Sequence, residues 1–453
     1  GFLHSNSKVT LAVTPLTTTT AFYPLNIGIS NLVRSAALRI GSQTVCEIDD
    51  YDQFHAYQSM FISNEDNKER EQFLSQRCIS HMPVYDDRTA NTDDKPINSA
   101  KKIGLDVGKN ATVPAAGGAG TFELLPFMKH SAASAQTIAD APVYSVYLSD
   151  LFPFLKFNQL PLFMIDQEVH IDIEFQPTTS SLSAAGLSRR MCIDATEGGT
   201  PANTVVEYQV NQDEVKLIYD SITFDGDIMQ KYREQNKSGL TFQYVDYRLA
   251  KRTGTVITAN PAPTPAIPYS NPFDNLNFQL GGNGRLVSKV IIGLQNSENF
   301  TPVSLLNGVG AKDVLAAESL SINLLYNDLY EFNVDRSNTA LLFHTTQHAE
   351  GKVPMVTRDE YQTSGVSAIT AETMEGHAQN SGAAGIGGLF RWTAIKPNKG
   401  QRVNNKGMDL TYKATGLPGG VGAGTGRNYT LRVYLEMLKV AKIENGQFSC
   451  YFA

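Results

Sequence analysis

Two clusters of carboxylates are the first candidates for chemistry in this sequence. Asp49, Asp50 and Asp52 lie within four residues of one another, and Asp86 is followed by Asp87. A glycoside hydrolase needs two carboxylates on opposite sides of a cleft, where they act as acid and as base or nucleophile. No other reactive side chain converges on either cluster in the sequence, so we interpret both clusters as solvated loops.

A pair of histidines is the second candidate. His344 and His348 have the i, i+4 spacing that places two imidazoles on one face of a helix, as a zinc site requires. The surrounding run Leu341–His348 is rich in β-branched and aromatic residues, and the glutamate that follows the first histidine in zinc proteases is absent. The sequence therefore predicts no metal site and no cofactor.

Glycine-rich stretches and aromatic residues complete the candidates. Gly281–Gly284 and Gly416–Gly426 lack the lysine of a phosphate-binding loop, so we interpret them as turns. No G-x-S-x-G nucleophile motif is present. The sequence predicts no catalytic residue, and we expect a protein that is not an enzyme. The remaining aromatics could line a ligand groove, but we interpret them as core or subunit-interface residues, where aromatics are enriched: Phe152, Phe154, Phe157, Phe163 and Trp392.

Composition narrows the possible partners. The chain has 453 residues, of which 42% are hydrophobic and 18% charged, with a formal net charge of −7. No block of lysine or arginine resembles a nucleic-acid-binding arm, so we expect no direct sequence-specific binding of nucleic acid. No run of 18 apolar residues is present, so we expect no transmembrane segment. The cysteines are far apart and follow no zinc spacing, so we interpret them as free, mostly buried thiols: Cys46, Cys78, Cys192 and Cys450.

Alternating apolar residues dominate the secondary-structure pattern. In Glu168–Phe175 the apolar side chains alternate with charged ones, which is typical of a strand with one wet face. Val215–Phe224 also reads as a strand. Asn445-Gly446 is a strong hairpin signal because both residues tolerate the positive φ of a type I′ turn. Tyr51–Cys78 has helical spacing and is the best helix candidate in the first half.

The strand candidates fall into two successive groups of about eight, and eight strands make a jelly roll. We therefore predict an all-β fold of two consecutive eight-stranded antiparallel jelly rolls, with short helices in the loops. The expected boundaries are an N-terminal jelly roll over 1–225, a helical linker over 226–239 and a C-terminal jelly roll over 240–453. Asp227 is the expected N-cap of the linker helix and Gly239 its stop. Long loops are expected at four places: 83–120, 176–203, 258–272 and 361–388.

The ordered set of segments resembles a known family. It is similar to the double jelly-roll major capsid proteins of eukaryotic double-stranded DNA viruses, which include the nucleocytoplasmic large DNA viruses, the virophages and the polinton-like viruses. No single segment is specific, but their order along the chain is. Four segments carry the resemblance: Asn31–Val45, Tyr147–Phe175, Leu217–Leu249 and Tyr434–Phe452.

The resemblance implies a structural role in a virion. Members of the family form homotrimers, and each trimer is a pseudo-hexameric capsomer that tiles an icosahedral shell. The implied partners are therefore further copies of the chain, neighbouring capsomers, and penton and minor capsid proteins. The implied location is the capsid shell, assembled inside the infected host cell. Long loops at one end of the sandwiches would clasp neighbours and form the outer surface.

Two other functions fit parts of the sequence. A two-domain β-sandwich could be a carbohydrate-binding protein or a glycoside hydrolase, which would need carboxylates and exposed aromatics converging on one cleft. A minor capsid or vertex protein is a third possibility, although the division into two halves argues against the single jelly roll usual in that class.

Overall fold

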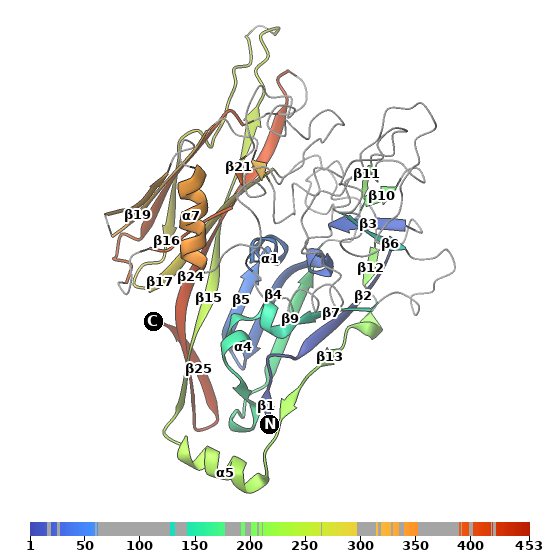
Figure 1. Ribbon diagram of the computed structural model, residues 1–453, viewed down its shortest axis with the longest axis vertical. Helices are drawn as coiled ribbons and strands as arrows, with labels where there is room; N and C mark the ends of the chain where they lie inside the picture. The colour runs from blue at the N-terminus through green and yellow to red at the C-terminus, as the bar shows by residue number, and fades with distance from the viewer. Residues whose placement is uncertain are drawn as a thin grey trace, which may run out of the picture.

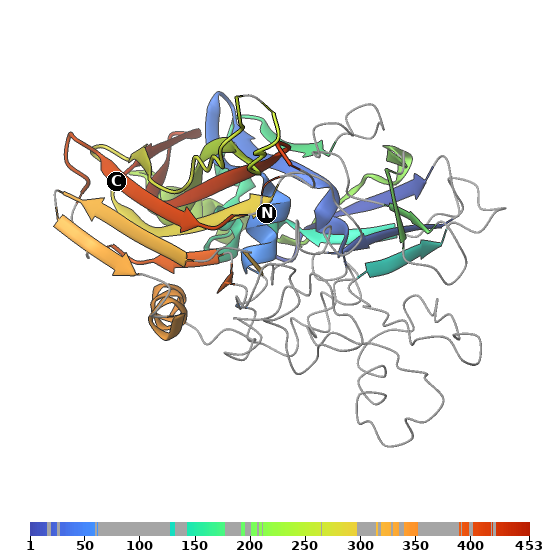
Figure 2. The same ribbon diagram turned by 90° about the horizontal axis from the view of Figure 1, so that it is seen from above.

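The structure is a computed structural model. It describes residues 1–15, 20–24, 28–58, 61, 127–131, 143–176, 192–194, 201–205, 208–210, 212–263, 265–296, 314–315, 319–327, 329–334, 339–351, 389–390, 392–397, 402–417, 419 and 423–453. Within these ranges it is built almost entirely from antiparallel strands, with a few short helices. The N-terminal and C-terminal halves stand side by side, and helix α5 joins them at one end (Figures 1 and 2). The predicted all-β fold class is confirmed.

The C-terminal half contains a five-stranded sheet and a four-stranded sheet. The first has the order β15-β24-β17-β22, with β25 added beside β24, and the second has the order β16-β23-β19-β20. A separate two-stranded sheet pairs β18 with β21. The strand bounds are β15 (Leu240–Ile257), β16 (Leu276–Gly281), β17 (Val287–Asn296), β18 (Val314–Leu315), β19 (Ser319–Tyr326), β20 (Leu329–Val334), β21 (Leu389–Phe390), β22 (Trp392–Ile395), β23 (Met408–Thr415), β24 (Gly426–Glu444) and β25 (Gln447–Phe452).

This strand order is that of a jelly roll. When the eight strands other than β25 in the two large sheets are numbered along the chain, the sheets read 1-8-3-6 and 2-7-4-5. The first and last strands pair over their whole described lengths, from Leu240 opposite Ile443 to Ile257 opposite Gly426. The C-terminal half is therefore a jelly roll by its own hydrogen-bonding pattern.

The N-terminal half is divided among smaller sheets. Their orders are β14-β1-β8, β11-β10-β3-β6, β12-β2-β13 with β7 also on β2, and β5-β4-β9. The described strands do not trace the complete eight-strand order, so a jelly roll in this half stays a prediction. The bounds are β1 (Phe2–Leu3), β2 (Lys8–Pro15), β3 (Thr20–Pro24), β4 (Val33–Ile40), β5 (Gln43–Asp49), β6 (Phe127–Ser131), β7 (Val143–Tyr147), β8 (Leu160–Pro161), β9 (Val169–Phe175), β10 (Cys192–Asp194), β11 (Pro201–Val205), β12 (Tyr208–Val210), β13 (Leu217–Ile218) and β14 (Ser221–Ile222).

Several local predictions can be compared with these elements. The alternating strand at Glu168–Phe175 is present as β9, with half-buried apolar and exposed charged side chains. The loop expected over 176–203 contains β10 and the start of β11, so that expectation was wrong there. The expected loops 83–120 and 361–388 lie outside the described residues. In the region expected as the loop 258–272, bridges pair Ile257 with Ser270 and Asn260 with Ile267.

The helices are short. The candidate at Tyr51–Cys78 is present over its first two turns as α1, and residues 62–78 lie outside the described ones. The linker helix begins at Gly226, with Asp225 rather than Asp227 at its N-cap. None of the described helices is long and apolar enough to cross a membrane. The bounds are α1 (Tyr51–Gln58), α3 (Leu148–Leu151), α4 (Pro153–Phe157), α5 (Gly226–Gln235) and α7 (Thr339–Glu350), with 3-10 turns η1 (Gly28–Leu32), η5 (Leu162–Met164) and η7 (Gln212–Glu214).

Two apolar cores stabilise the chain. The smaller core lies between the two sheets of the C-terminal jelly roll and is built only from that half. The larger core fills the N-terminal half and also takes in C-terminal residues such as Tyr244, Trp392 and Tyr434. Because the larger core contains residues of both halves, the two halves are packed against each other and are not joined merely by a linker.

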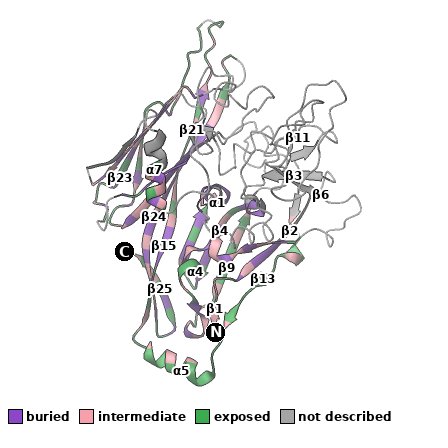
Figure 3. Ribbon diagram, in the orientation of Figure 1, coloured by how far each residue is buried: buried purple, intermediate pink, exposed green. Residues whose placement is uncertain are grey.

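Strand β24 belongs to both cores. Every residue from Tyr429 to Leu435 is buried (Figure 3). A strand with one face in solvent would instead alternate between buried and exposed residues. The odd-numbered Leu431 and Val433 pack in the C-terminal core, and the even-numbered Tyr434 packs in the shared core. Apolar and β-branched side chains on both faces suit this strand to the centre of the molecule.

The hairpin between β24 and β25 forms as predicted. Asn445 and Gly446 have φ values of 50° and 79°, the left-handed conformation that a type I′ turn requires. A Cβ atom at Gly446 would also meet the carboxylate of Asp166. The Asp166 amide donates a hydrogen bond of 2.9 Å to the Gly446 carbonyl, so the two segments cannot separate freely.

We therefore expect Gly446→Ala to lower the free energy of unfolding by about 1–3 kcal/mol, from backbone strain and the close contact together. Gly284 is the matched control, since it also has positive φ, at 71°, but a Cβ atom there meets nothing within 4 Å. Urea denaturation of both variants measures the difference. Equal losses in the two variants would show that the contact with Asp166 contributes nothing.

Candidate functional site

The most distinctive site is the contact between the two halves, which we call the seam. Its N-terminal side is the continuous segment formed by β5 and α1, Gln43–Gln58. Its C-terminal side is formed by residues of β15, β17 and β24, together with the end of α7. Aromatic rings line it: the centroid of Phe54 lies 4.4 Å from that of Tyr247 and 5.2 Å from that of Tyr434. Three groups of charged side chains are embedded among these rings.

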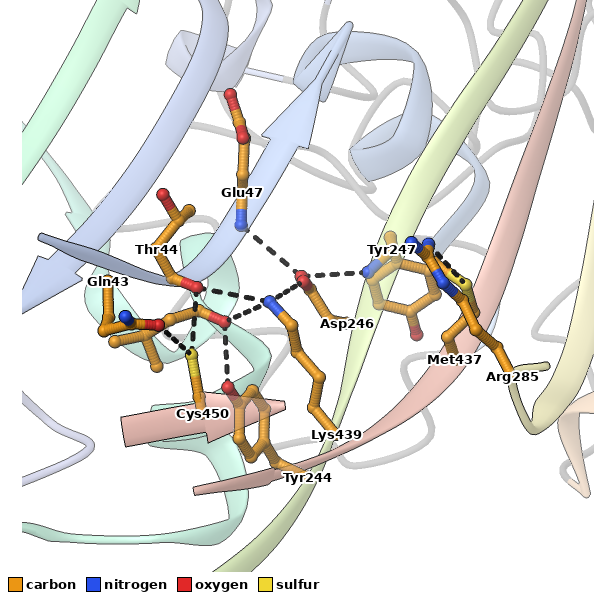
Figure 4. Close-up of polar contacts among 11 residues, drawn as sticks. Gln43, Thr44, Glu47, Tyr244, Asp246, Tyr247, Arg285, Met437, Lys439 and Cys450 are labelled. Carbon is orange, nitrogen blue, oxygen red and sulfur yellow. Dashed lines mark hydrogen bonds and ion pairs between the residues drawn. The ribbon is translucent and has the colours of Figure 1, made fainter. Parts of the chain in front are cut away.

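The first group centres on Asp246 and Lys439, whose Nζ and Oδ2 atoms are 2.7 Å apart (Figure 4). Both side chains are only 7% exposed. The Lys439 ammonium also donates to the carbonyls of Thr44 and Val45, at 3.2 and 3.0 Å. The amides of Glu47 and Tyr247 donate to Asp246 (Figure 4). Lys439 therefore connects a carboxylate of one half to the main chain of the other.

The second group joins Asp50 to two cations of the C-terminal half. Arg432 Nε lies 2.6 Å from Asp50 Oδ2, and Lys251 Nζ lies 3.3 Å from the same atom. Arg432 also donates to Gln295 on β17. The Tyr434 hydroxyl donates to the Asp50 main-chain carbonyl at 3.0 Å. Asp50 itself has a positive φ of 47°, so the chain turns sharply there to deliver this carboxylate into the seam.

The third group surrounds Lys289 on β17. Its ammonium lies 3.0 Å from carboxylate oxygens of both Glu350 and Glu436. The Tyr57 hydroxyl donates to Glu350 at 2.6 Å, and the Tyr247 hydroxyl donates to Glu436 at the same distance. Through Tyr57 this group also reaches the N-terminal half.

The pKa values of the carboxylates in these groups are shifted in different directions. Burial alone would raise the pKa of Asp50, but the attraction of Arg432 and Lys251 outweighs it and lowers the pKa. The pKa of Glu436 is lowered in the same way by Lys289 and by hydrogen bonds, against the effect of burial. At Asp246 burial prevails over the attraction of Lys439, and the pKa is raised.

These shifts predict an acid-sensitive seam. Asp50 has a folded-state pKa below its usual value of 3.8, so it stabilises the fold above that value and loses this contribution as the pH falls through the folded pKa. Asp246 acts in the opposite direction, because protonation in acid relieves the cost of burying its charge. We expect Asp50→Asn to be less stable at pH 7 and to lose less stability than the wild type below about pH 4.

Urea midpoints measured from pH 7 to pH 3 test this expectation. Asp172→Asn is the control, since its ion pair with Arg39 is half exposed and such pairs contribute little. A wild-type acid profile in Asp50→Asn would contradict the assignment of the acid sensitivity to Asp50.

The arrangement suits positioning rather than catalysis. The carboxylates of the three charged groups are each paired with at least one cation, and those of Asp246, Glu350 and Glu436 also accept main-chain or tyrosine hydrogen bonds. Burial raises the pKa values of Tyr247 and Cys46 well above their ordinary ranges, so neither is activated for proton transfer or attack. A buried pair that is well hydrogen-bonded can fix one orientation of two packed units, and we infer that role here.

The two carboxylate clusters singled out in the sequence have different outcomes. Asp50 and Asp52 were interpreted as part of a solvated loop, and that interpretation was wrong: Asp50 lies in the seam and Asp52 is 1% exposed beside Gln53 and Gln176. Asp49 is exposed. The Asp86 pair lies outside the described residues.

His344 and His348 both lie on α7, where their side chains are exposed. The spacing thus does place two imidazoles on a helix, although this run is rich in β-branched and aromatic residues. No group of three or more potential metal ligands occurs among the described residues.

The aromatic candidates lie mostly in the core. Trp392, Phe152 and Phe154 are fully buried, as interpreted from the sequence, whereas Phe157 is 66% exposed. Of the cysteines, Cys46 and Cys450 are free thiols. Cys192 lies in β10, and Cys78 falls outside the described residues.

An open cavity lies at the end of the molecule that carries α5. Its volume is about 760 Å³. Apolar side chains from η5, α5 and β24 form part of it, including Phe163, Met229 and Ile443, and Arg233 and Lys237 of α5 lie on its wall. Arg233 also lies 3.8 Å from the Asp166 carboxylate. The cavity combines apolar and charged groups without a convergent set of reactive ones.

The seam residues were missed at the level of sequence. A usable signal exists, because Asp246, Arg432 and Lys439 are each flanked on both sides by apolar residues in segments that read as strands. A lone charge in such a run either faces solvent or meets a buried partner of opposite sign. Choosing between these requires knowing which strand faces lie between the two halves.

No family model matches the chain, and no curated protein matches it. Among solved structures, it is similar to the quasi-atomic model of the PBCV-1 virus capsid, with a TM-score of 0.46 and 13% identity, covering 99% of this chain and 91% of that one. The Sputnik virophage structure gives 0.43 and 11%, covering 100% and 83%. The Faustovirus major capsid protein gives 0.43 and 9%, covering 97% and 85%.

Proposed function

We propose that this chain is a structural major capsid protein that trimerises into pseudo-hexameric capsomers, which tile an icosahedral virion shell. The observation that carries the proposal is the 1-8-3-6 and 2-7-4-5 strand order of the C-terminal half, which the seam joins to an N-terminal half also built from antiparallel strands. A chain with two sandwiches held in one orientation contributes two sides of a hexagon, so three chains around a threefold axis supply six.

The proposal extends to domains and partners. It divides the chain into jelly rolls over 1–225 and 240–453, with the helical linker over 226–239 between them. The partners would be two further copies of the chain, neighbouring capsomers, and penton and minor capsid proteins. The location would be the virion shell, after assembly inside the infected cell. The acidic net charge of −7 supports a shell protein that does not itself wrap nucleic acid.

The carbohydrate-directed alternative receives less support. A glycoside hydrolase needs two carboxylates facing a cleft that a sugar can enter. The paired carboxylates of Asp50, Asp246 and Glu436 are buried in the seam and engaged by cations. Trp392, the residue best suited to stack on a sugar, is 1% exposed.

The test is the solution mass of the purified chain by light scattering, with negative-stain images of the same peak. We expect a particle near three times 49.5 kDa with a hexagonal outline. A chain that stays monomeric at high concentration would contradict the proposal, and glycan-binding and hydrolase assays would then become the informative measurements.

A further inference from the structure

A continuous segment of the N-terminal half leaves large apolar side chains in solvent. We call this segment, 215–228, the base edge; it comprises β13, β14 and the start of α5, and it is coloured mostly as exposed (Figure 3). Six of the large exposed apolar residues of the described chain fall within its fourteen positions: Val215 (36%), Leu217 (47%), Ile218 (45%), Tyr219 (58%), Phe224 (50%) and Ile228 (52%).

Strand β13 exposes apolar side chains on both of its faces. Leu217 and Ile218 are consecutive, so they point to opposite faces of the strand, yet both are exposed. A strand with apolar side chains on both faces is typical of one that is buried on both faces. Within the described chain the base edge has no such cover.

The base edge is also a sheet edge. Strand β13 pairs with β2 and is the last strand of its sheet among the described residues. Its hydrogen bonds to the chain involve even-numbered residues: the Thr10 amide donates to the Lys216 carbonyl at 2.9 Å, and the His4 amide donates to the Asp220 carbonyl at 3.0 Å. By antiparallel geometry the main-chain groups of Leu217 and Tyr219 point outward. Proteins usually protect such edges with charge, proline or a covering element, because exposed edges associate.

The exposed area is of the size that an interface needs. Six large apolar side chains, each about half exposed, present on the order of 500 Å², if a fully exposed one has about 150–200 Å². A stable interface buries about 800 Å² on each partner, of which roughly 60% is apolar. The base edge alone would supply that apolar share.

The charges around the base edge restrict the kind of occupant. Asp220, Asp225 and Asp227 lie along it, and Lys216 is the one basic residue between Val215 and Ile228. An acidic border disfavours anionic lipid surfaces and nucleic acid, which attract basic segments. The occupant that fits is therefore a protein.

We propose that the base edge is a self-association surface, covered in the assembled protein by a second copy of this chain. This inference rests on the proposed function, because a shell subunit meets other copies of itself at high local concentration. It adds the location of the contact: β13 and the residues that lead into α5, rather than the long loops that the sequence favoured for clasping neighbours.

Tyr219→Asp tests the proposal, with Val143→Asp as the matched control. Both residues are exposed apolar residues, at 58% and 50%, and they belong to segments on opposite sides of β2. We expect Tyr219→Asp to raise the dissociation constant of the assembly at least tenfold in sedimentation or light scattering, and Val143→Asp to leave it within about threefold. Thermal melts of the separated monomers verify that both variants fold.

Hydrogen exchange of the wild type gives a second readout that needs no variant. The amides of 217–221 should exchange more slowly in the assembled form than in the diluted monomer. If the wild type assembles while Tyr219→Asp assembles equally well and these amides gain no protection, the base edge is not the contact, and the proposed function survives. If the wild type never assembles, the proposed function itself fails. If copies of the chain associate through another surface and a different protein covers the base edge, Tyr219→Asp would assemble as well as the wild type and the amides of 217–221 would gain no protection.

Discussion

Replacing Lys439 with methionine is expected to lower the free energy of unfolding by about 3–5 kcal/mol, the cost of leaving a buried carboxylate without its partner. Asp246 would keep only the amide hydrogen bonds from Glu47 and Tyr247 at a site that is 7% exposed. The carbonyls of Thr44 and Val45 would lose their charged donor and keep the Cys450 thiol and the Tyr244 hydroxyl. Because these carbonyls belong to the N-terminal half, the loss should weaken the contact between the halves in particular.

Urea denaturation measures the effect, and the double variant Asp246→Leu with Lys439→Met separates the two contributions. We expect the double variant to recover most of the lost stability, because an apolar pair can replace a buried ion pair at little cost. Arg34→Met is the exposed control, since the Arg34–Glu174 pair is more than half exposed and should contribute less than about 1 kcal/mol. A loss in Lys439→Met no larger than in the control would show that the seam pair is not a buried one in solution.

Truncating Trp392 to alanine should have an effect of similar size, about 3–5 kcal/mol, because it opens a large cavity in a close-packed core. Its ring is 1% exposed and lies 5.6 Å from the ring of Tyr57 and 6.4 Å from that of Tyr434. The adjacent Gly293 has no side chain, and a Cβ atom there would collide with the indole. The tryptophan therefore fills space that belongs to both halves.

Two further variants show whether cavity size explains the result. Trp392→Phe keeps an aromatic ring in place and should lose clearly less stability than Trp392→Ala. Tyr451→Ala removes a ring that is 56% exposed and should change the free energy of unfolding by no more than about 0.5 kcal/mol. If Trp392→Ala proved as mild as Tyr451→Ala, the shared core would not be close-packed at this point.

The parts of the fold that depend on neighbours in sequence could be predicted. The turn at Asn445-Gly446 and the alternation of Glu168–Phe175 are set by the conformational preferences of adjacent residues. Both appear in the structure as predicted. The all-β class followed from many such local patterns, each of which needs no knowledge of distant segments.

The parts of the fold that depend on partners distant in the sequence could not be predicted. Asp50 looked like a solvated loop residue because its partner, Arg432, is 382 positions away. Leu341–His348 looked unlike a helix by composition, yet α7 forms there, where the Thr346 hydroxyl accepts a hydrogen bond from the Ala394 amide at 3.2 Å. Tertiary contacts outweigh weak local propensity in both places.

The segment Val215–Phe224 forms less regular structure than its sequence predicts. Its apolar run predicts a full strand, but only the two-residue strands β13 and β14 form, and the run stays exposed. A local pattern can show that a segment is suited to burial without showing what covers it. For this segment we assign the cover to another molecule.

The double burial of β24 has a consequence for biosynthesis. Residues 240–425 leave the ribosome before this strand does, yet β24 is the neighbour of both β15 and β17. Until it is translated, those strands lack their hydrogen-bonding partner, and Asp50 and Asp246 lack the cations Arg432 and Lys439. The nascent chain must therefore hold a C-terminal sheet with open edges and a shared core that lacks residues of β24, a state prone to aggregation and suited to chaperone capture. Completion of this one late strand would close the C-terminal sheet and fill the shared core together, so that only chains that already contain β24 become competent to assemble.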